Sequence, residues 1–304
     1  MKYLVGMDGG ATKTDCVTTD IDGNVLHKCT GGPANFLIIG TDKVCNTLFN
    51  LITECKTKLN AEYSDFQSIV LGTTGAGRRS DAEKLENTFK EFAKSKGTSL
   101  NFYVDSDARI ALEGAFSGKP GSILIAGTGS IMFGKDVNGK ILRVGGYGRF
   151  IGDQGSGYNI GRKGLSAIAK YYDGRGDHTM LTKIFTDKFK IETPEGLIVA
   201  IYKNNFDIAS VAPLVIEAAE KDDEVCNSIV QEETDELILH ILAMVKKINL
   251  PEFKLALIGS LITTDNYYSR IFRKKIEMLA VKVSIKTPEL QPAMGAVLMA
   301  KKRI

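Results

Sequence analysis

The sequence predicts an α/β protein made of two related domains, and three observations lead to this fold class. Short apolar runs typical of buried strands alternate with longer segments whose apolar residues recur at helical spacing. The chain has 304 residues, which exceeds the usual size of a single hydrophobic core. A strand–turn–strand pattern also occurs twice, as "DIDGNVL" at 20–26 and "DVNGKIL" at 136–142. Alternating strands and helices favour open sheets covered on both faces, with ligands at the strand ends.

The two copies of the pattern share an acidic start, an Asp-Gly or Asn-Gly turn and an apolar restart, which together indicate a β-hairpin. Each copy follows a glycine-rich loop after an apolar strand, "LVGMDGGATKT" first and "SILIAGTGSIMFGKD" second. Such turns also arise by chance, so duplication and coincidence both stay open. Duplication predicts that the two loops occupy equivalent positions in two domains.

Strands and helices alternate in the first half of the chain. The apolar start at 3–5 predicts a strand, and the alternation over 15–28 predicts a hairpin that turns at Asp22-Gly23. Further strands are expected at "FQSIVLGTTGAG" and "LNFYVDSDA", because both contain apolar runs that end in small or polar residues. Apolar residues at helical spacing predict helices at 42–59, 80–96 and 108–116.

The second half is predicted to be mainly helical after its hairpin. "FKLALIGSLI" has the composition of a buried strand, and it ends at Gly259-Ser260. The helical segments are expected at 157–172, 179–188, 196–204, 207–221, 223–247, 269–280 and 291–302.

Composition excludes several classes of protein. The net charge of +3 is too small to suggest nucleic-acid or membrane-surface binding. No apolar run approaches the roughly 18 residues of a membrane span, and no secretory leader is recognisable, so we expect a cytoplasmic protein. Three histidines, expected to be structural or at the surface, stand far apart at 27, 178 and 240. Five cysteines without a C-x-x-C pair predict reduced thiols rather than disulfides or a zinc site, at 16, 29, 45, 55 and 226.

The stretch "GMDGGATKT" at 6–14 concentrates candidate phosphate ligands at a strand end. It matches neither the Walker loop, which needs a glycine directly before its lysine, nor the dinucleotide loop, which opens a helix. Backbone N–H groups of a glycine-rich turn form a nest for anions. A carboxylate beside phosphates calls for a cation such as Mg²⁺, so Asp8 is a candidate metal residue. A plain hairpin turn is the alternative; the candidate phosphate ligands are Gly9, Gly10, Thr12, Lys13 and Thr14.

"AGTGS" at 126–130 has similar ingredients. Gly127 and Gly129 would allow close approach of a ligand, and Thr128 and Ser130 would supply hydroxyl groups. A single loop of this composition is common in hairpin turns, whereas two such loops in equivalent positions of a repeated unit indicate phosphate binding.

"VDSDARIALEGAF" places carboxylates where a strand leads into a helix. Asp105 or Ser106 could cap that helix, the commonest role of these residue types. Asp107 could instead accept the proton of an attacking hydroxyl, as phosphotransferases require.

Other polar residues accompany these segments. In the glycine-rich stretch 145–164, Asp153 has Gln154 and Asn159 nearby, which suits sugar hydroxyls, although a flexible crossover is the alternative. Asn35 follows a Gly-Pro turn and is either a turn residue or a polar contact. Two arginines in "GTTGAGRRS" form either a solvated pair or a site for an anionic substrate group, Arg78 and Arg79.

Together these segments resemble the actin–hexokinase–heat-shock ATPase superfamily. "DGGATKT" is similar to its first phosphate loop, "AGTGS" to its second and "LALIGSLI" to its adenosine loop, where Ser260 replaces the commoner second glycine. Over essentially its whole length the chain most resembles the BadF/BadG-type ATPase group, especially N-acetylglucosamine kinases. The most specific match is "AGTGS" followed by "GGYGRFIGDQGS". The chain departs from the animal enzymes at Tyr147, where tryptophan is frequent.

The resemblance implies two related ribonuclease-H-like/actin-like ATPase domains with a cleft between them, at 1–117 and 118–289. A C-terminal helix at 290–304 is expected to pack back on the first domain. The implied activity is that of an ATP-dependent kinase acting on the 6-hydroxyl of N-acetylglucosamine or a related hexosamine. ATP and Mg²⁺ are the implied cofactors and a small sugar the partner, with a homodimer as a possible assembly.

The resemblance also assigns roles by position. Asp107 becomes the catalytic base, Asp8 acts on the metal, and Gly259 and Ser260 join the two loops as ATP-binding residues. The implied sugar-binding residues are Asn35, Asp107, Thr128, Gly145, Gly146 and Asp153.

Three rival interpretations are weaker. An activator of an iron–sulfur radical dehydratase or reductase belongs to the same group but needs interface cysteines, and only Cys226 follows Cys55. A non-catalytic sugar sensor would not need Asp8, Asp107 and both loops. A kinase of the zinc-containing repressor-related family would need a cysteine cluster that the sequence lacks.

Overall fold

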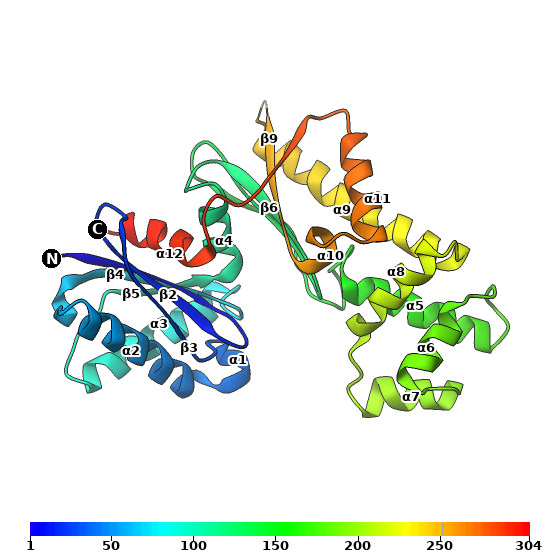
Figure 1. Ribbon diagram of the computed structural model, residues 1–304, viewed down its shortest axis with the longest axis horizontal. Helices are drawn as coiled ribbons and strands as arrows, with labels where there is room; N and C mark the ends of the chain where they lie inside the picture. The colour runs from blue at the N-terminus through cyan, green and yellow to red at the C-terminus, as the bar shows by residue number, and fades with distance from the viewer. Residues whose placement is uncertain (251) are drawn as a thin grey trace. The chain divides into compact units, whose positions relative to one another are not determined.

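The computed structural model describes residues 1–250 and 252–304, and the chain folds into two compact units. Unit 1 comprises Met1–Gly121 together with Thr287–Ile304, and unit 2 comprises Ser122–Lys286. Each unit contains a five-stranded sheet with helices packed against it (Figure 1). The predicted domain boundaries lie within a few residues of these divisions. Within the described residues, no helix is both long and apolar enough to cross a membrane.

The sheet of unit 1 has the strand order β3-β2-β1-β4-β5. The first three strands form an antiparallel meander, which confirms the predicted hairpin, and the last two run parallel to β1. The strands are β1 (Tyr3–Gly9), β2 (Thr14–Asp20), β3 (Val25–Gly31), β4 (Phe66–Thr73) and β5 (Phe102–Ser106).

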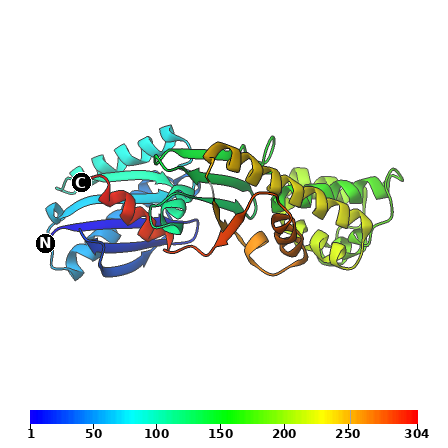
Figure 2. The same cartoon turned by 90° about the horizontal axis from the view of Figure 1, so that it is seen from above.

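Helices cover both faces of this sheet because successive strand residues point to opposite sides. The main ones are α2 (Thr41–Lys58), α3 (Arg79–Ser95), α4 (Asp107–Ala115) and α12 (Pro292–Lys301). Val5 and Met7 of β1 join a core with α2 and α3, whereas Leu4 joins a second core with α4 and α12. Figures 1 and 2 both show α12 beside α4, although the two helices are far apart in the sequence.

The sheet of unit 2 has the order β10-β9-β6-β7-β8, which is the order of unit 1 with each strand replaced by its counterpart five places later. As in unit 1, the strand after the meander is parallel to the first strand of the unit. The strands are β6 (Gly121–Ala126), β7 (Ser130–Lys135), β8 (Ile141–Gly145), β9 (Phe253–Ile258) and β10 (Val283–Lys286). The shared topology favours duplication over coincidence as the origin of the repeated hairpin.

The two repeated turns also share their hydrogen bonds. Oδ1 of Asp20 accepts backbone N–H groups from Asp22, Gly23 and Asn24, at 2.9 to 3.0 Å. Oδ1 of Asp136 likewise accepts from Asn138 and Lys140, at 2.9 and 2.8 Å. In both turns the Asp side chain satisfies the backbone donors that the reversal leaves unpaired.

Unit 2 adds a group of helices around a single core. The helix predicted at 157–172 is observed over the same residues, whereas the one predicted at 207–221 divides into a 3₁₀ turn, η2 (Ile208–Val211), and α8. Pro213 lies in the first turn of α8, where its missing N–H group costs no hydrogen bond. The helices are α5 (Gly157–Tyr172), α6 (Leu181–Phe189), α7 (Pro194–Lys203), α8 (Ala212–Glu220), α9 (Glu224–Ile248) and α11 (Tyr267–Glu277).

Short elements that the sequence did not predict complete both units. Edge strand β10 has only four residues, too few for a clear alternation. The others are α1 (Phe36–Ile39), η1 (Tyr63–Asp65) and α10 (Ser260–Thr263).

Candidate functional site

The base of the first phosphate loop is formed by Gly9 and Thr14, which pair across β1 and β2. A Cβ on Gly9 would lie 2.8 Å from Cβ of Ala34, so only glycine allows the two segments to pack this closely. The buried hydroxyl of Thr14 donates to the Gly32 carbonyl at 2.7 Å. Thr14 therefore anchors the chain before α1, and its contact with phosphate stays a prediction.

The turn of this loop is closed by its own backbone, because the N–H of Gly10 donates to the Lys13 carbonyl at 2.9 Å. Thr12 and Lys13 are exposed at its tip. Nζ of Lys13 lies 2.7 Å from the Asp15 carboxylate. The lysine thus has a partner of its own, while Thr12 has its hydroxyl at the surface of the loop.

Asp107 is the first residue of α4, and its two oxygens have different partners. Oδ1 accepts the N–H of Ala108 at 2.7 Å, and Oδ2 accepts the hydroxyl of Thr74 at 2.8 Å. The cap of α4 is Ser106, whose hydroxyl accepts the N–H of Arg109 at 3.2 Å. Ser106 is therefore the cap that the sequence left undecided, and Asp107 is partly exposed beside it.

The Asp8 carboxyl belongs to the same acidic group in unit 1. The pKa of Asp8 is raised to about 6, mainly by burial and also by the nearby charges of Asp107 and Asp15, while Lys13 opposes the rise. Three carboxylates near one lysine leave excess negative charge, which a bound cation would neutralise. Oxygen ligands of this kind suit Mg²⁺.

Asn35 is buried and caps the short helix α1, since its side-chain oxygen accepts the N–H of Leu37 at 3.2 Å. This contact matches the turn interpretation and leaves a sugar contact as a prediction. The two arginines differ. Arg79 pairs with Glu83 at 2.8 Å. The exposed guanidinium of Arg78 makes no hydrogen bond or ion pair with the described residues.

The second phosphate loop joins β6 to β7 and is tied to the start of α5. The N–H groups of Gly157 and Tyr158 donate to the carbonyls of Gly127 and Thr128, at 2.8 and 3.1 Å. Thr128 is exposed. The loop therefore sits on the N-terminus of α5. The first three N–H groups of α5 are taken by these two carbonyls and by the Ser156 hydroxyl, so the helix dipole is what favours an anion there.

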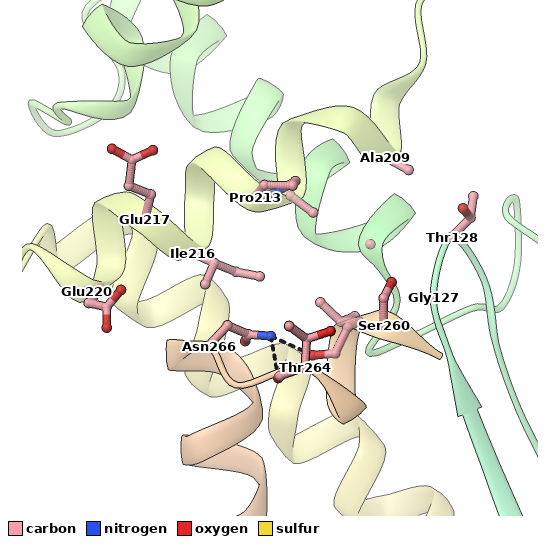
Figure 3. Close-up of a pocket in the computed structure, with 13 residues that line it drawn as sticks. Gly127, Thr128, Ala209, Pro213, Ile216, Glu217, Glu220, Ser260, Thr264 and Asn266 are labelled. Carbon is pink, nitrogen blue, oxygen red and sulfur yellow. Dashed lines mark hydrogen bonds between the residues drawn. The ribbon is translucent and has the colours of Figure 1, made fainter. Parts of the chain in front are cut away.

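A pocket of about 460 Å³ opens beside this loop (Figure 3). Its volume falls within the usual range of a small-molecule site, about 300–1,000 Å³. The wall combines apolar side chains with polar ones from three separate segments, and Glu217 and Glu220 lie at one end. Both carboxylates are paired, with Lys221 and Arg270 respectively. The lining residues are Gly127, Thr128, Gly157, Ala209, Ala212, Pro213, Ile216, Glu217, Glu220, Ser260, Leu261, Thr264 and Asn266.

Gly259 shapes the floor of the predicted adenosine loop. Its φ is +99°, and a Cβ there would lie 2.2 Å from the Ala126 carbonyl oxygen. A side chain is therefore excluded both by conformation and by contact with β6. This arrangement brings Ser260, the next residue, to the wall of the pocket next to Gly127 and Thr128.

Asp153 lies against the second phosphate loop, because a Cβ on Gly129 would be 3.1 Å from its Oδ2. Its backbone is left-handed, with φ of +57°. Burial raises the pKa of the Asp153 carboxyl, and a hydrogen bond from the Ser130 backbone opposes the rise. Strain of this kind persists only where the surrounding structure enforces it.

Gly145 ends β8 and Gly146 follows it, with φ of +71° and +70°. A Cβ on Gly145 would lie 2.3 Å from Nε2 of His240. The Arg143 guanidinium donates to both glycine carbonyls, at 2.9 and 2.6 Å. Contact of these glycines with a sugar stays a prediction.

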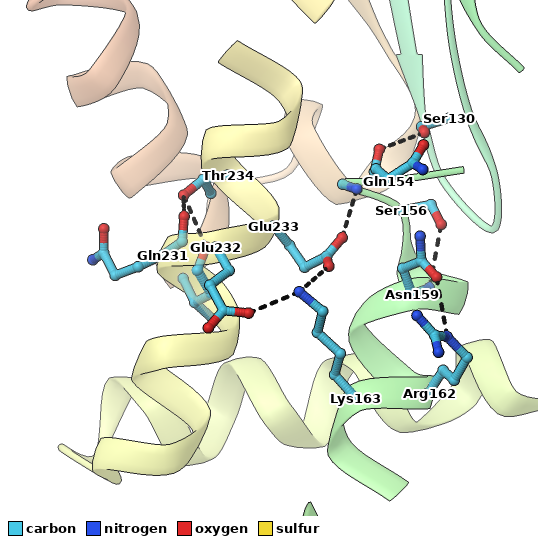
Figure 4. Close-up of polar contacts among 12 residues, drawn as sticks. Ser130, Gln154, Ser156, Asn159, Arg162, Lys163, Gln231, Glu232, Glu233 and Thr234 are labelled. Atoms are coloured by element: carbon cyan, nitrogen blue, oxygen red, sulfur yellow. Dashed lines mark hydrogen bonds and ion pairs between the residues drawn. The ribbon is translucent and has the colours of Figure 1, made fainter. Parts of the chain in front are cut away.

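A buried network holds the segment around Asp153 (Figure 4). The Glu233 carboxylate of α9 accepts the N–H of Gly155 at 2.6 Å and pairs with Lys163 at 2.7 Å. The Tyr268 hydroxyl donates to the carbonyl oxygens of Gly155 and Glu233, at 2.9 and 3.0 Å. Helices α5, α9 and α11 together fix this turn.

Asn159 and Gln154, which the sequence offered for sugar hydroxyls, serve the same turn. The Asn159 side-chain amide donates to the Gly152 carbonyl at 3.2 Å. Gln154 contributes its main-chain carbonyl, which accepts the Ser130 hydroxyl at 2.6 Å, so a sugar contact of its side chain stays a prediction. Sequence reasoning missed Thr74 and Glu233. Thr74 could have been found, because it lies in "GTTGAG", a strand end that the sequence analysis had already noted. Glu233 could not, because no pattern in its helix sets it apart from the other acidic residues.

The fold and the site together define a class, the two-domain actin-like ATPases. Solved structures support this fold. A candidate N-acetylglucosamine kinase of Chromobacterium violaceum aligns with a TM-score of 0.71 at 22% identity, covering 99% of each chain. A ROK hexokinase of Thermus thermophilus aligns with a TM-score of 0.56 at 16% identity, covering 98% of this chain and 97% of that one.

Within this class the chain belongs to the BadF/BadG/BcrA/BcrD ATPase family, which it matches over residues 5–300. An N-acetylmuramic acid/N-acetylglucosamine kinase of Clostridium acetobutylicum is 36% identical over 99% of both chains. An N-acetyl-D-glucosamine kinase of Dictyostelium discoideum is 31% identical over 98% of both chains. The predicted resemblance to this family is confirmed.

Proposed function

We propose that this protein is an amino-sugar kinase that transfers the γ-phosphate of MgATP to the 6-hydroxyl of N-acetylglucosamine or a related hexosamine. The observation that carries the proposal is the Asp107 carboxylate, held by Thr74 in the same acidic group as Asp8 of the phosphate loop. The near-full-length relatives named above as kinases of N-acetylmuramic acid and N-acetylglucosamine support this class of acceptor.

Unit 2 would bind the nucleotide. Ile216, Pro213 and Leu261 offer an apolar wall for a purine, and Asn266 and Ser260 offer polar atoms. Phosphates extending past Gly127 and Thr128 would lie near the positive end of the α5 dipole.

Asp8 would hold Mg²⁺, directly or through water. Its raised pKa reflects burial beside other acids, and this donor set fits a divalent cation. When bound, the ion neutralises charge on the transferring phosphate.

Asp107 would act as the general base. Thr74 and the N–H of Ala108 fix the carboxylate, and its exposed edge would accept the proton of the sugar 6-hydroxyl as the hydroxyl attacks. The sugar would also contact Asp153, Asn35, Thr128 and the N–H groups of the two glycines after β8.

Arg78 could decide whether an acidic or a neutral hexosamine is preferred. Its guanidinium has no partner among the described residues, so it is available for the carboxylate of an acidic sugar such as N-acetylmuramic acid. A charged hydrogen bond of this kind is worth about 1.5–3 kcal/mol. Arg78→Ala would therefore raise KM for N-acetylmuramic acid roughly 10- to 100-fold and leave KM for N-acetylglucosamine nearly unchanged.

The test measures initial rates of ADP release with ATP and Mg²⁺ over glucose, glucosamine, N-acetylglucosamine, N-acetylmannosamine and N-acetylmuramic acid. We expect an N-acetylated sugar to be preferred to glucose, and product analysis to place the phosphate on O6. A site built to hydrogen-bond the acetamido group can reject an analogue lacking it by up to about 10⁴–10⁵. Preference for glucose, or ADP release independent of sugar, would contradict the proposal.

The alternative is an activator carrying an iron–sulfur cluster, and unit 2 offers no group of cysteines for one. Cys226 is the one cysteine in the sequence of unit 2, and it is buried against Thr179. A brown protein after purification without air would favour the activator.

A further inference from the structure

Three of the five cysteines, far apart in the sequence, meet in unit 1. Cys16 lies on β2, Cys29 on β3 and Cys55 on α2. Sγ of Cys55 lies 3.8 Å from Sγ of Cys16 and 3.8 Å from Sγ of Cys29, and all three sulfurs lie within 4.8 Å of one another. Cys16 and Cys55 are buried, and Cys29 is half-buried.

These separations suit a shared metal ion. A tetrahedral zinc ion with Zn–S bonds of about 2.3 Å places its sulfur ligands about 3.8 Å apart. A disulfide would instead need its two sulfurs about 2.05 Å apart. A soft cation is also the partner that lets several thiolates be buried together.

A histidine lies close to one of the three thiols. His27 precedes Cys29 by two residues on β3, so both side chains project from the same face of the strand. One ring nitrogen of His27 lies within 4.8 Å of Sγ of Cys29. Its Nε2 is buried without a hydrogen-bond partner and lies 3.5 Å from the Glu54 carboxylate. His27 is grouped with Cys29 and Glu54 but not with Cys16 or Cys55, so its side chain must turn to join the three sulfurs.

We propose that Cys16, Cys29 and Cys55 bind one zinc ion, and that His27 turns its side chain to supply the fourth ligand. Binding would release the three thiol protons to solvent and leave the imidazole neutral. The ion would tie β2 and β3 to α2, close to where β3 leads into the loop of Asn35 and where β2 begins at Thr14. Its role is structural, because all four coordination positions are filled by protein.

Metal content is the first measurement. The untagged full chain, purified without chelator, is expected to carry one zinc per chain by mass spectrometry of the metal. After chelator treatment, Co²⁺ should give thiolate charge-transfer bands and the intense visible bands of a tetrahedral site. A protein that carries no metal and shows no such bands on Co²⁺ titration would overturn the proposal, and copper in place of zinc would overturn the choice of ion.

Variants then identify the ligands. Cys29→Ser, at the half-buried position, is expected to lose the zinc while the protein still folds by circular dichroism. The matched control is Cys45→Ser, a buried cysteine on the same helix as Cys55 but outside the cluster, which should keep it. Unchanged cobalt bands in Cys29→Ser would overturn the site. His27→Gln should shift the visible bands, and an unshifted spectrum would remove His27 from the ligand set.

Discussion

Replacing Asp8 by asparagine should stabilise the ligand-free protein while disabling the enzyme. The pKa of Asp8 rises from 3.8 to about 6, mainly through burial. One pKa unit corresponds to about 1.36 kcal/mol, so ionised Asp8 costs unit 1 up to about 3 kcal/mol. Partial solvent access reduces this to about 2 kcal/mol.

The sign follows from linkage. An acid with a higher pKa in the folded chain has no effect on stability when both states are protonated, below about pH 3.8, and its full cost is present above about pH 6. Asp8→Asn lacks this cost. The variant should therefore match the parent near pH 4 and exceed it by about 2 kcal/mol near pH 7.5.

Urea unfolding followed by circular dichroism, with EDTA and without nucleotide, measures the difference in the free energy of unfolding. Asp187→Asn, at an exposed position on α6, is the control and should show no gain at either pH. An Asp8→Asn protein no more stable than the parent near pH 7.5 would refute the reasoning. Full kinase activity in this variant would show that Asp8 is only a turn residue.

Three further predictions concern other parts of the site. Asp107→Asn keeps the shape of the side chain and should lower kcat about 10²–10⁴-fold in a folded protein, by ADP-release assay; near-normal kcat would exclude it as the base. Gly259→Ala should cost more than about 3 kcal/mol of stability by urea unfolding, because its Cβ would collide with the Ala126 carbonyl. Gly23→Ala has φ of +100° but no atom nearby and should cost about 1–2 kcal/mol; equal losses would show that the collision with Ala126 does not matter. Lys163→Met leaves the buried Glu233 carboxylate without its ion-pair partner and should cost about 3–5 kcal/mol of stability by urea unfolding. Lys221→Met, at the exposed pair with Glu217, should cost less than about 1 kcal/mol, and similar losses in the two variants would show that the buried network does not stabilise the fold.

Local sequence patterns correctly predict the turns, helices and helix caps around the site. The hairpin turns at Asp20 and Asp136 depend on hydrogen bonds within a few residues, and both form as the repeated motif indicates. The helix over 157–172 and the Ser106 cap likewise depend on neighbours in the sequence. Such features are visible because the interacting groups are close along the chain.

Contacts across long sequence separations could not be predicted. Tyr268 reaches the Gly155 carbonyl across 113 residues, and the Cys16 and Cys55 sulfurs meet across 39. The even spacing of apolar residues along α9 gives no sign that Glu233 points inward. Its burial follows from the packing of α5, α9 and α11, which is decided by tertiary structure.

The repeated loops also show why the Asp8 effect should be confined to unit 1. When Gly9 is matched to Gly127, the counterpart of Asp8 is Ala126, which is fully buried beneath Gly259. A carboxylate there would have no solvent and no room, so the proposed phosphate contacts of the loop in unit 2 are limited to backbone and hydroxyl groups. Unit 1 keeps its acid partly exposed, where a cation can reach it. If both loops bind phosphate, as we propose, the residue at this one position decides that only the first can hold the metal, and Asp8→Asn tests that property.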